Sequence, residues 1–251
     1  MLTVSGRDFT AAELVAAKGV TSISVCLPAQ NEEATIGPIV ASIVEHLVEG
    51  APLVDEVVVV DDASTDATAE VARRAGARVV ATTTPNGKGE ALRTSLVASR
   101  GDLVAWCDAD IVNFDPCFVT GLLGPLLREP AVSFVKACYR RDLDGRAGEG
   151  GRVTELLARP LLARLFPHLA GFAQPLAGEY AGRRSLLERM TFVPGYGVDL
   201  GLLIDVAELV GVEAMVQVDL NQRSHRNRPL AELARQADAV LAIALERAGI
   251  G

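Results

Sequence analysis

The stretch Leu103-Val-Ala-Trp-Cys-Asp-Ala-Asp110 is an apolar run that ends in two carboxylates separated by one residue. Its length and apolar character predict one buried strand. Carboxylates at the end of such a strand are costly unless cations meet them. Asp108 and Asp110 could bind a divalent metal that in turn holds a diphosphate. A loop or a helix cap is the alternative for an isolated pair, so the neighbouring segments decide between these interpretations.

Strands and polar loops alternate before this stretch. Residues 22–27 and 56–61 predict two strands, and each is followed by a polar loop and a helical pattern. This alternation predicts right-handed crossovers and a mostly parallel sheet of the α/β class, in which ligands collect beyond the carboxyl ends of the strands. Three polar loops are therefore expected on one rim of the sheet: residues 28–33, 61–66 and 108–110.

A glycine-bounded segment, Asn86-Gly-Lys-Gly-Glu90, opens the next predicted helix. Free amides at a helix start and the charge of Lys88 could bind an anion. The segment lacks the upstream glycine and the Ser or Thr of a P-loop, which counts against a nucleoside triphosphatase. A turn with a solvated lysine is the alternative. Gly151-Arg-Val-Thr154, at the start of a later helix, offers a second phosphate site or simply a capped helix with an exposed arginine.

The remaining segments predict a compact chain without repeats or an evident second domain. We expect, in order, a helical lead-in over residues 1–20, a strand at 78–81, a helix at 116–127, a strand at 132–139, a polar connector at 140–151, a turn and short helix from 174–180, a helix at 200–210, a strand at 216–220 and a closing helix.

Composition narrows the class of protein. The 251 residues are 49% hydrophobic and carry a net charge of −8, which argues against general binding to nucleic acid or anionic membrane. The sequence shows no secretion signal and no apolar run long enough to span a bilayer, so a cytoplasmic location is expected. The four cysteines are irregularly spaced and are interpreted as reduced core residues. His225 lies in a basic segment, 223–229, and is either a structural residue or a ligand.

These motifs together resemble a known family over residues 22–249. Pro28-Ala-Gln-Asn-Glu-Glu33, the 61–66 loop, Gly87-Lys-Gly-Glu90 and Asp108-Ala-Asp110 resemble a GT-A fold nucleotide-sugar glycosyltransferase. Four later segments resemble the glucosyl-3-phosphoglycerate synthase family: Gly151-Arg-Val-Thr-Glu-Leu156, residues 174–180, Pro194-Gly-Tyr-Gly-Val198 and His225-Arg-Asn-Arg-Pro229.

The resemblance implies a retaining transfer of glucose from UDP-glucose to 3-phosphoglycerate by a homodimer that uses Mg²⁺, or Mn²⁺ in its place. It implies a single domain over residues 1–251, with a nucleotide-sugar half at about 22–112 and an acceptor half at about 113–251. The implied roles are as follows: Asp199 and Arg152 as catalytic candidates; Pro28, Ala29, Gln30, Glu32, Asp62, Gly87, Lys88, Asp108, Ala109, Gly178, Glu179, Tyr196 and Arg228 for the donor; Gly151, Arg152, Val153, Thr154 and Asn227 for the acceptor; and Asp110 and His225 for the metal.

Three departures from the family pattern leave alternatives open. Asp199 stands where glutamate is expected, Asp62 stands where a smaller residue is expected, and the loop before Gly87 is short. A mannosyl-3-phosphoglycerate synthase that uses GDP-mannose is therefore an alternative. A sugar-phosphate nucleotidyltransferase and a noncatalytic nucleotide-sugar sensor are two others. A sugar-phosphate nucleotidyltransferase would normally carry a Gly-rich basic loop after the first strand, where this chain has Pro28-Ala-Gln-Asn-Glu-Glu33.

Overall fold

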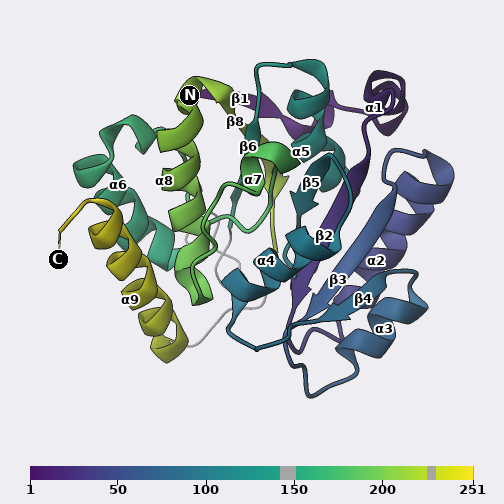
Figure 1. Cartoon of the computed structure of the whole chain (residues 1–251), viewed down its shortest axis with the longest axis horizontal. Helices are drawn as coiled ribbons and strands as arrows, with labels where there is room; N and C mark the ends of the chain where they lie inside the picture. The colour runs from purple at the N-terminus through teal and green to yellow at the C-terminus, as the bar shows by residue number, and fades with distance from the viewer. Residues whose placement is uncertain (142–150, 225–229, 251) are drawn as a thin grey trace.

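A computed structural model describes residues 1–141, 151–224 and 230–250 of the chain. Within these residues one eight-stranded sheet forms the centre of the molecule (Figure 1), and its strand order is β1-β8-β6-β7-β5-β2-β3-β4. Every strand pair is parallel except those that involve β7, which runs antiparallel to both β5 and β6. The strands are β1 (Leu2–Ser5), β2 (Ile23–Ala29), β3 (Glu56–Asp61), β4 (Arg78–Ala81), β5 (Leu103–Trp106), β6 (Phe134–Arg140), β7 (Tyr180–Arg183) and β8 (Met215–Gln222).

Helices cover both faces of the sheet, as a parallel sheet requires. Alternate side chains of each strand enter opposite cores, so Val25 and Leu27 pack on one face and Cys26 on the other. The first face is covered by α1 (Ala11–Lys18), α2 (Ile36–Ile43), α3 (Thr68–Arg74) and α5 (Cys117–Arg128). The second is covered by α4 (Lys88–Ala98), α6 (Arg159–Leu165), α7 (Arg184–Leu187), α8 (Val198–Val210) and α9 (Leu230–Arg247).

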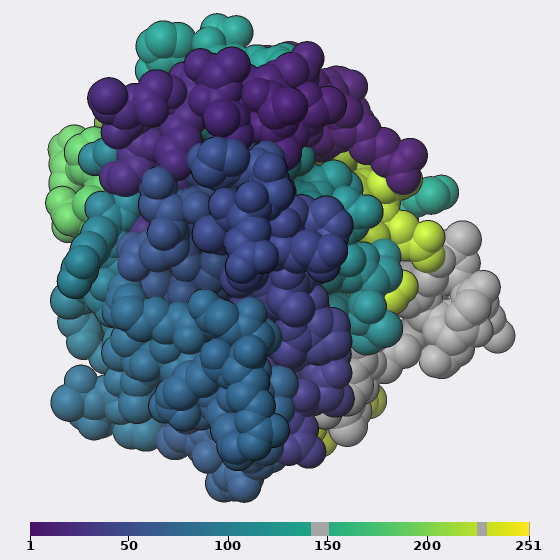
Figure 2. Space-filling model, turned by 90° about the vertical axis from the view of Figure 1, so that its right-hand side faces the viewer, coloured from purple at the N-terminus to yellow at the C-terminus, as the bar shows by residue number. Residues whose placement is uncertain are grey.

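The mixed, mostly parallel α/β sheet confirms the predicted fold class. Two details differ from the sequence-based expectation. Residues 1–20 do not form a helical lead-in throughout, because β1 pairs with β8 before α1 begins. Figure 2 shows this N-terminal segment, in purple, along one end of the molecule. Residues 174–180 do not lead directly into a helix, because β7 comes first and enters the sheet between β5 and β6.

The ends of the strands determine where the polar loops meet. Ala29 of β2 lies opposite Asp61 of β3, and Cys26 lies opposite Trp106 of β5, so the three strands end at one rim. Cys26, Cys107 and Cys138 are buried with free thiols, as expected of core residues. Within the described residues, no helix has both the length and the apolar character needed to cross a bilayer.

Candidate active site

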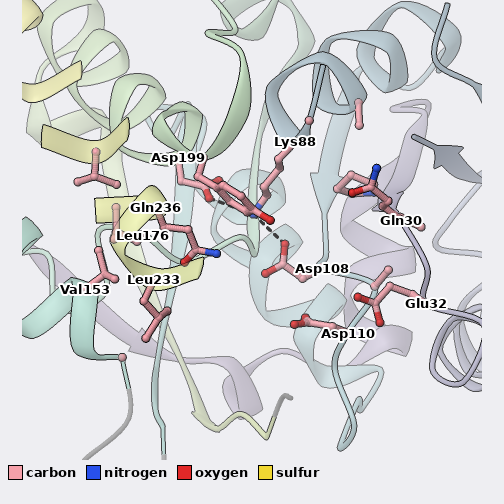
Figure 3. A pocket seen from close by; sticks show the side chains of 18 of the residues that line it. Gln30, Glu32, Lys88, Asp108, Asp110, Val153, Leu176, Asp199, Leu233 and Gln236 are labelled. Carbon is pink, nitrogen blue, oxygen red and sulfur yellow. Dashed lines mark hydrogen bonds and ion pairs between the residues drawn. The ribbon is translucent and has the colours of Figure 1, made fainter. Parts of the chain in front are cut away.

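A cavity of about 450 Å³ opens at the carboxyl ends of β2, β3 and β5 (Figure 3). We call one side the sheet wall: Pro28–Glu32, Asp62, Asp108–Asp110, Gly87 and Lys88. The other side is the helix wall: Gly151–Thr154, Leu176, Tyr196, Asp199, Leu233, Gln236 and Val240. The floor is formed by Arg141 and Arg223, which follow β6 and β8.

The β2 and β3 loops of the sheet wall hold each other in place. Gln30 donates from Nε2 to the carbonyl of Asp62 at 2.7 Å. The Asp62 carboxylate, only 4% exposed, accepts from the Gly87 amide at 3.0 Å and from the Thr82 hydroxyl at 2.8 Å. Asp62 therefore fixes the short segment that leads into α4. Gly87 has φ +75° and a Cβ there would lie 3.2 Å from Gly195 Cα, so both its backbone conformation and its surroundings favour glycine.

Lys88 joins the two walls. Its Nζ donates to Asp108 Oδ1 at 2.8 Å and to Asp199 Oδ2 at 3.0 Å, contacts that Figure 3 marks with dashed lines. Burial alone would lower the pKa of Lys88, but Asp108 and Asp199 outweigh it and raise the pKa. Burial alone would raise the pKa of Asp108, but Lys88 and Arg223 outweigh it and lower the pKa. Lys88 and Asp108 are thus both charged at neutral pH.

Arg223 holds the two carboxylates at the end of β5 from below. Its Nη2 lies 2.8 Å from Asp108 Oδ2 and 2.7 Å from Asp110 Oδ1. Its Nε lies 2.9 Å from Glu179 Oε1, and both of these side chains are buried. Burial raises the pKa of Glu179, although Arg223 opposes that effect. The Asp-x-Asp motif is therefore paired with two cations, Lys88 and Arg223. Their charges offset the cost of placing two carboxylates at the end of a buried strand.

Two predicted donor residues lie behind the cavity rather than in its wall. Gly178 packs against Asp108 so closely that a Cβ would overlap the carboxylate. Glu179 is fully buried and accepts from the Tyr139 hydroxyl at 2.7 Å. Both residues therefore support Asp108 and Arg223 from beneath, whereas the resemblance implied that they line the sugar pocket.

The helix wall combines a helix start with apolar side chains. Gly151 has φ +75°, which glycine adopts without strain, and the helical segment begins directly after it. The first turn thus brings backbone amides to the cavity, with Thr154 almost buried. Leu176 and the α9 residue Leu233 face the cavity across from the sheet wall (Figure 3), and Val240 of α9 also lines the cavity. Apolar surface here shields the charged sheet wall from water, which strengthens its electrostatic interactions.

Lys136 of β6 lies beneath the helix wall. Its Nζ donates to the carbonyl of Ala177 at 2.8 Å and lies 3.4 Å from the carbonyl of Asp199. Its ammonium also sits 4.6 Å above the ring of Tyr180. Burial lowers the pKa of Lys136 to about 8. This lysine ties the turn before β7 to the start of α8, the two segments that support Asp199.

Most residues proposed from the sequence come together in this cavity. The cavity is lined by sixteen of them: Pro28, Ala29, Gln30, Glu32, Asp62, Gly87, Lys88, Asp108, Ala109, Asp110, Gly151, Arg152, Val153, Thr154, Tyr196 and Asp199. His225, Asn227 and Arg228 lie outside the described residues.

Sequence reasoning assigned no role to Arg141, Arg223 or Lys136. Arg223 begins the basic segment after the last predicted strand, and that position was the available signal. Three α9 residues line the cavity: Leu233, Gln236 and Val240. The spacing of Leu233 and Val240 fits a core helix equally well, and Gln236 belongs to no motif, so no signal in the sequence pointed to this part of the site.

The carboxylates of Asp108 and Asp110 suit a divalent ion that prefers oxygen ligands. In the described part of the chain, no cluster of three or more His, Cys, Asp or Glu side chains could hold a metal by itself. Asp110 opens to the cavity, so oxygens of a bound diphosphate could complete a coordination shell there. The residues present therefore fit an ion that is held jointly by the protein and its ligand.

Comparison with known proteins adds a family to this geometry. The family model described as glycosyl transferase family 2 matches residues 24–189. A glucosyl-3-phosphoglycerate synthase from Mycolicibacterium paratuberculosis is 52% identical, over 96% of this chain and 77% of its own length. The Mycobacterium tuberculosis glucosyl-3-phosphoglycerate synthase, solved with Mn²⁺, UDP-glucose and phosphoglyceric acid, superposes with a TM-score of 0.89 at 48% identity and covers 97% of this chain and 85% of that one. The same synthase solved with Mg²⁺ and UDP gives a TM-score of 0.92 at 47% identity, over 100% of this chain and 87% of that one.

Proposed function

The chain belongs to glycosyl transferase family 2 and, within it, to the glucosyl-3-phosphoglycerate synthases, and from this premise we propose that it transfers glucose from UDP-glucose to 3-phosphoglycerate with retention at the anomeric carbon. The observation that carries the proposal is one cavity in which a charged sheet wall faces the helix start at Gly151–Thr154. The first suits a nucleotide diphosphate and the second suits an anionic acceptor.

The sheet wall is proposed to bind the donor. The uridine would be held by the loop at residues 28–32, which includes Pro28, Ala29, Gln30 and Glu32, and by Asp62. Gly87 and Tyr196 would lie against the nucleotide. Lys88 is positioned to offset negative charge on the diphosphate, because its ammonium lies within 3.0 Å of both Asp108 and Asp199 at the cavity surface. Asp199 would meet the sugar, with Gly178 and Glu179 in support. Arg228 is proposed for the diphosphate from sequence alone.

A divalent ion, Mg²⁺ or Mn²⁺, would be held by Asp110 and by His225, and it would supply positive charge to the leaving diphosphate. Asp108 is proposed to contact the nucleotide, since both of its oxygens already accept from Lys88 and Arg223. Arg223 keeps Asp110 oriented toward the cavity through its 2.7 Å contact. These side chains hold the reacting groups without reorganisation during the transfer.

The helix wall is proposed to bind the acceptor. The amides of Gly151, Arg152, Val153 and Thr154 and the charge of Arg152 suit a phosphate, and Asn227 would assist. The acceptor hydroxyl would then attack from the face that the leaving diphosphate occupies, and that diphosphate would accept the proton. This path accounts for retention without a protein nucleophile, and it restricts the role of Asp199 to orienting the sugar.

Three further features are proposed from the family resemblance: a homodimer, a cytoplasmic location, and a single domain over residues 1–251 with the nucleotide-sugar half at 22–112 and the acceptor half at 113–251. The continuous sheet supports the last of these, because β5, from the first half, pairs directly with β7, from the second.

A panel of sugar nucleotides tests the proposed function. Purified protein is incubated with Mg²⁺, 3-phosphoglycerate and, in separate reactions, UDP- and GDP-linked sugars, and release of the nucleoside diphosphate is measured. UDP release from UDP-glucose at the highest rate is expected. Release from GDP-mannose alone would favour the mannosyl alternative, pyrophosphate formation from a nucleoside triphosphate would favour the nucleotidyltransferase, and tight binding without release would favour a sensor.

A further inference from the structure

One guanidinium of the cavity has hydrogen-bonding capacity that its neighbours do not use. Arg141 follows β6 directly and lines the cavity. Its Nη2 donates to the hydroxyl of Tyr139 at 2.7 Å, and the guanidinium lies 5.1 Å from the centre of the Tyr139 ring. Its Nε is buried and has no hydrogen-bond partner within the described part of the chain. A buried N–H without a partner is costly, and an anionic ligand bound against this cavity-lining guanidinium would offset that cost.

The position of Arg141 is fixed by a chain of contacts that ends at the Asp-x-Asp motif. The Tyr139 hydroxyl accepts from Arg141 and donates to Glu179 at 2.7 Å. Glu179 contacts Arg223 at 2.9 Å, and Arg223 reaches Asp108 at 2.8 Å. A guanidinium anchored in this way loses little conformational freedom when it binds a ligand. It also places a cation in the wall of the cavity.

The helix start of the acceptor wall lies beside this guanidinium. A Cβ at Gly151 would lie 3.6 Å from Arg141 Cδ, so Arg141 and the Gly151–Thr154 turn border the same corner. Backbone amides at a helix start suit the three oxygens of a phosphate. The corner therefore offers two kinds of anion site, a helix start and a planar guanidinium that matches a carboxylate.

The acceptor has two anionic groups at different distances from its reacting hydroxyl. In 3-phosphoglycerate the carboxylate is bonded directly to the carbon that bears the reacting hydroxyl, whereas the phosphate is linked to that carbon through a methylene group and an ester oxygen. Arg141 is connected to Asp108 indirectly, through Tyr139, Glu179 and Arg223. We propose that Arg141 binds the carboxylate of the acceptor while the Gly151–Thr154 turn binds its phosphate, so that Arg141 selects 3-phosphoglycerate over glycerol 3-phosphate. This inference rests on the proposed function and identifies Arg141 as the residue that recognises the acceptor carboxylate.

Titration calorimetry on the protein loaded with UDP and Mg²⁺ tests this assignment. The dissociation constants of 3-phosphoglycerate and glycerol 3-phosphate are measured for the wild type and for R141M. Loss of one charge-assisted contact is expected to weaken 3-phosphoglycerate binding by roughly 10- to 100-fold. Glycerol 3-phosphate lacks the carboxylate, so its dissociation constant should stay within about twofold, since only the phosphate contacts remain.

Two variants serve as matched comparisons. Arg140 is the neighbouring arginine, is exposed, and does not line the cavity, so R140M should change neither dissociation constant. R152A removes a cation from the proposed phosphate site and should weaken both ligands. R141K keeps the charge without the planar fork, and it should weaken 3-phosphoglycerate less than R141M does while still sparing glycerol 3-phosphate.

The assignment would be overturned if R141M and R141K weakened the binding of 3-phosphoglycerate and of glycerol 3-phosphate by the same factor. It would also be overturned if neither dissociation constant changed. Circular dichroism melting of each variant identifies loss of fold, and R141K keeps the test valid if R141M does not fold. Failure of the proposed function looks different, because the wild type itself would then show no turnover of 3-phosphoglycerate with any sugar nucleotide.

Discussion

The sheet wall and the helix wall satisfy their polar groups in different ways. On the sheet wall, Lys88 and Asp108 contact charged partners within 3.0 Å, and Arg223 closes the set from the floor. On the helix wall, the cavity meets apolar side chains such as Leu233 and Val240 together with a helix start. Charges that neutralise one another in a buried site are also part of the folding energy. Substitution of Lys88 or Asp108 should therefore affect stability and activity together, whereas substitution of Leu233 or Val240 should affect binding alone.

The largest effect on activity is expected from D110A. Asp110 is the proposed metal ligand, and its loss should lower kcat/KM for glucosyl transfer by roughly 10²–10³-fold because the leaving diphosphate loses charge stabilisation. Arg223 keeps its contacts with Asp108 and Glu179, so the melting temperature should change little. Mn²⁺ binding followed by electron paramagnetic resonance in the presence of UDP provides a second readout. The exposed carboxylate Asp8 offers a control in D8A, and undiminished Mn²⁺ binding by D110A would rule out the metal assignment.

K88M sharpens the contrast by testing stability on the sheet wall. Removing the ammonium leaves Asp108 and Asp199 without their shared partner, at a cost of roughly 3 kcal/mol in the free energy of unfolding. R93M on the same helix removes an exposed pair with Glu90 and should lower the free energy of unfolding far less than K88M does. Urea unfolding measures both values.

The double variant K88M/D199N separates stability from activity. It neutralises the carboxylate that K88M leaves unpaired, so most of the lost stability should return while turnover stays low. If K88M and R93M were equally stable, the buried charges of the sheet wall would not contribute to folding, and the contrast between the walls would fail.

A pH dependence of the stability is expected from Lys136, which lies beneath the helix wall. Burial lowers its pKa from 10.5 to about 8. Between these values the unfolded chain holds a proton that the folded chain has released, so the free energy of unfolding should rise with pH by up to about 1.4 kcal/mol per unit. Below about pH 8 both states hold the proton, and this contribution stays constant. The free energy of unfolding of the wild type minus that of K136M should therefore rise from pH 8 to 10. If the two free energies changed with pH in the same way, so that their difference stayed constant, the assignment to Lys136 would be wrong.

The sheet wall was the part of the site that sequence could predict. Its residues follow β2, β3 and β5, and each of these strands is a local apolar run followed by a polar loop. Once the sheet is parallel, the chemistry of the loops at its rim follows from strand order. The prediction that residues 28–33, 61–66 and 108–110 share one rim of the sheet is therefore confirmed, and Lys88 lies at the same rim.

The floor and the rest of the helix wall depend on contacts between distant segments, which periodicity does not encode. β7 has four residues and lies in the middle of the sheet only because β5 and β6 provide edges for it. β1 likewise owes its strand conformation to pairing with β8. One of the partners of Arg223 is Glu179, which precedes β7, so this ion pair could not be predicted before that strand was placed.

The most direct test of the account is a proton NMR time course of the purified protein with Mg²⁺, UDP-glucose and 3-phosphoglycerate. We predict that the anomeric signal of UDP-glucose is replaced by a new anomeric signal with the small coupling of an α-glucoside, from glucose attached to the phosphoglycerate. No signal should form when the acceptor is omitted. A product with the large coupling of a β-glucoside, or the unchanged donor signal in the complete reaction, would contradict it.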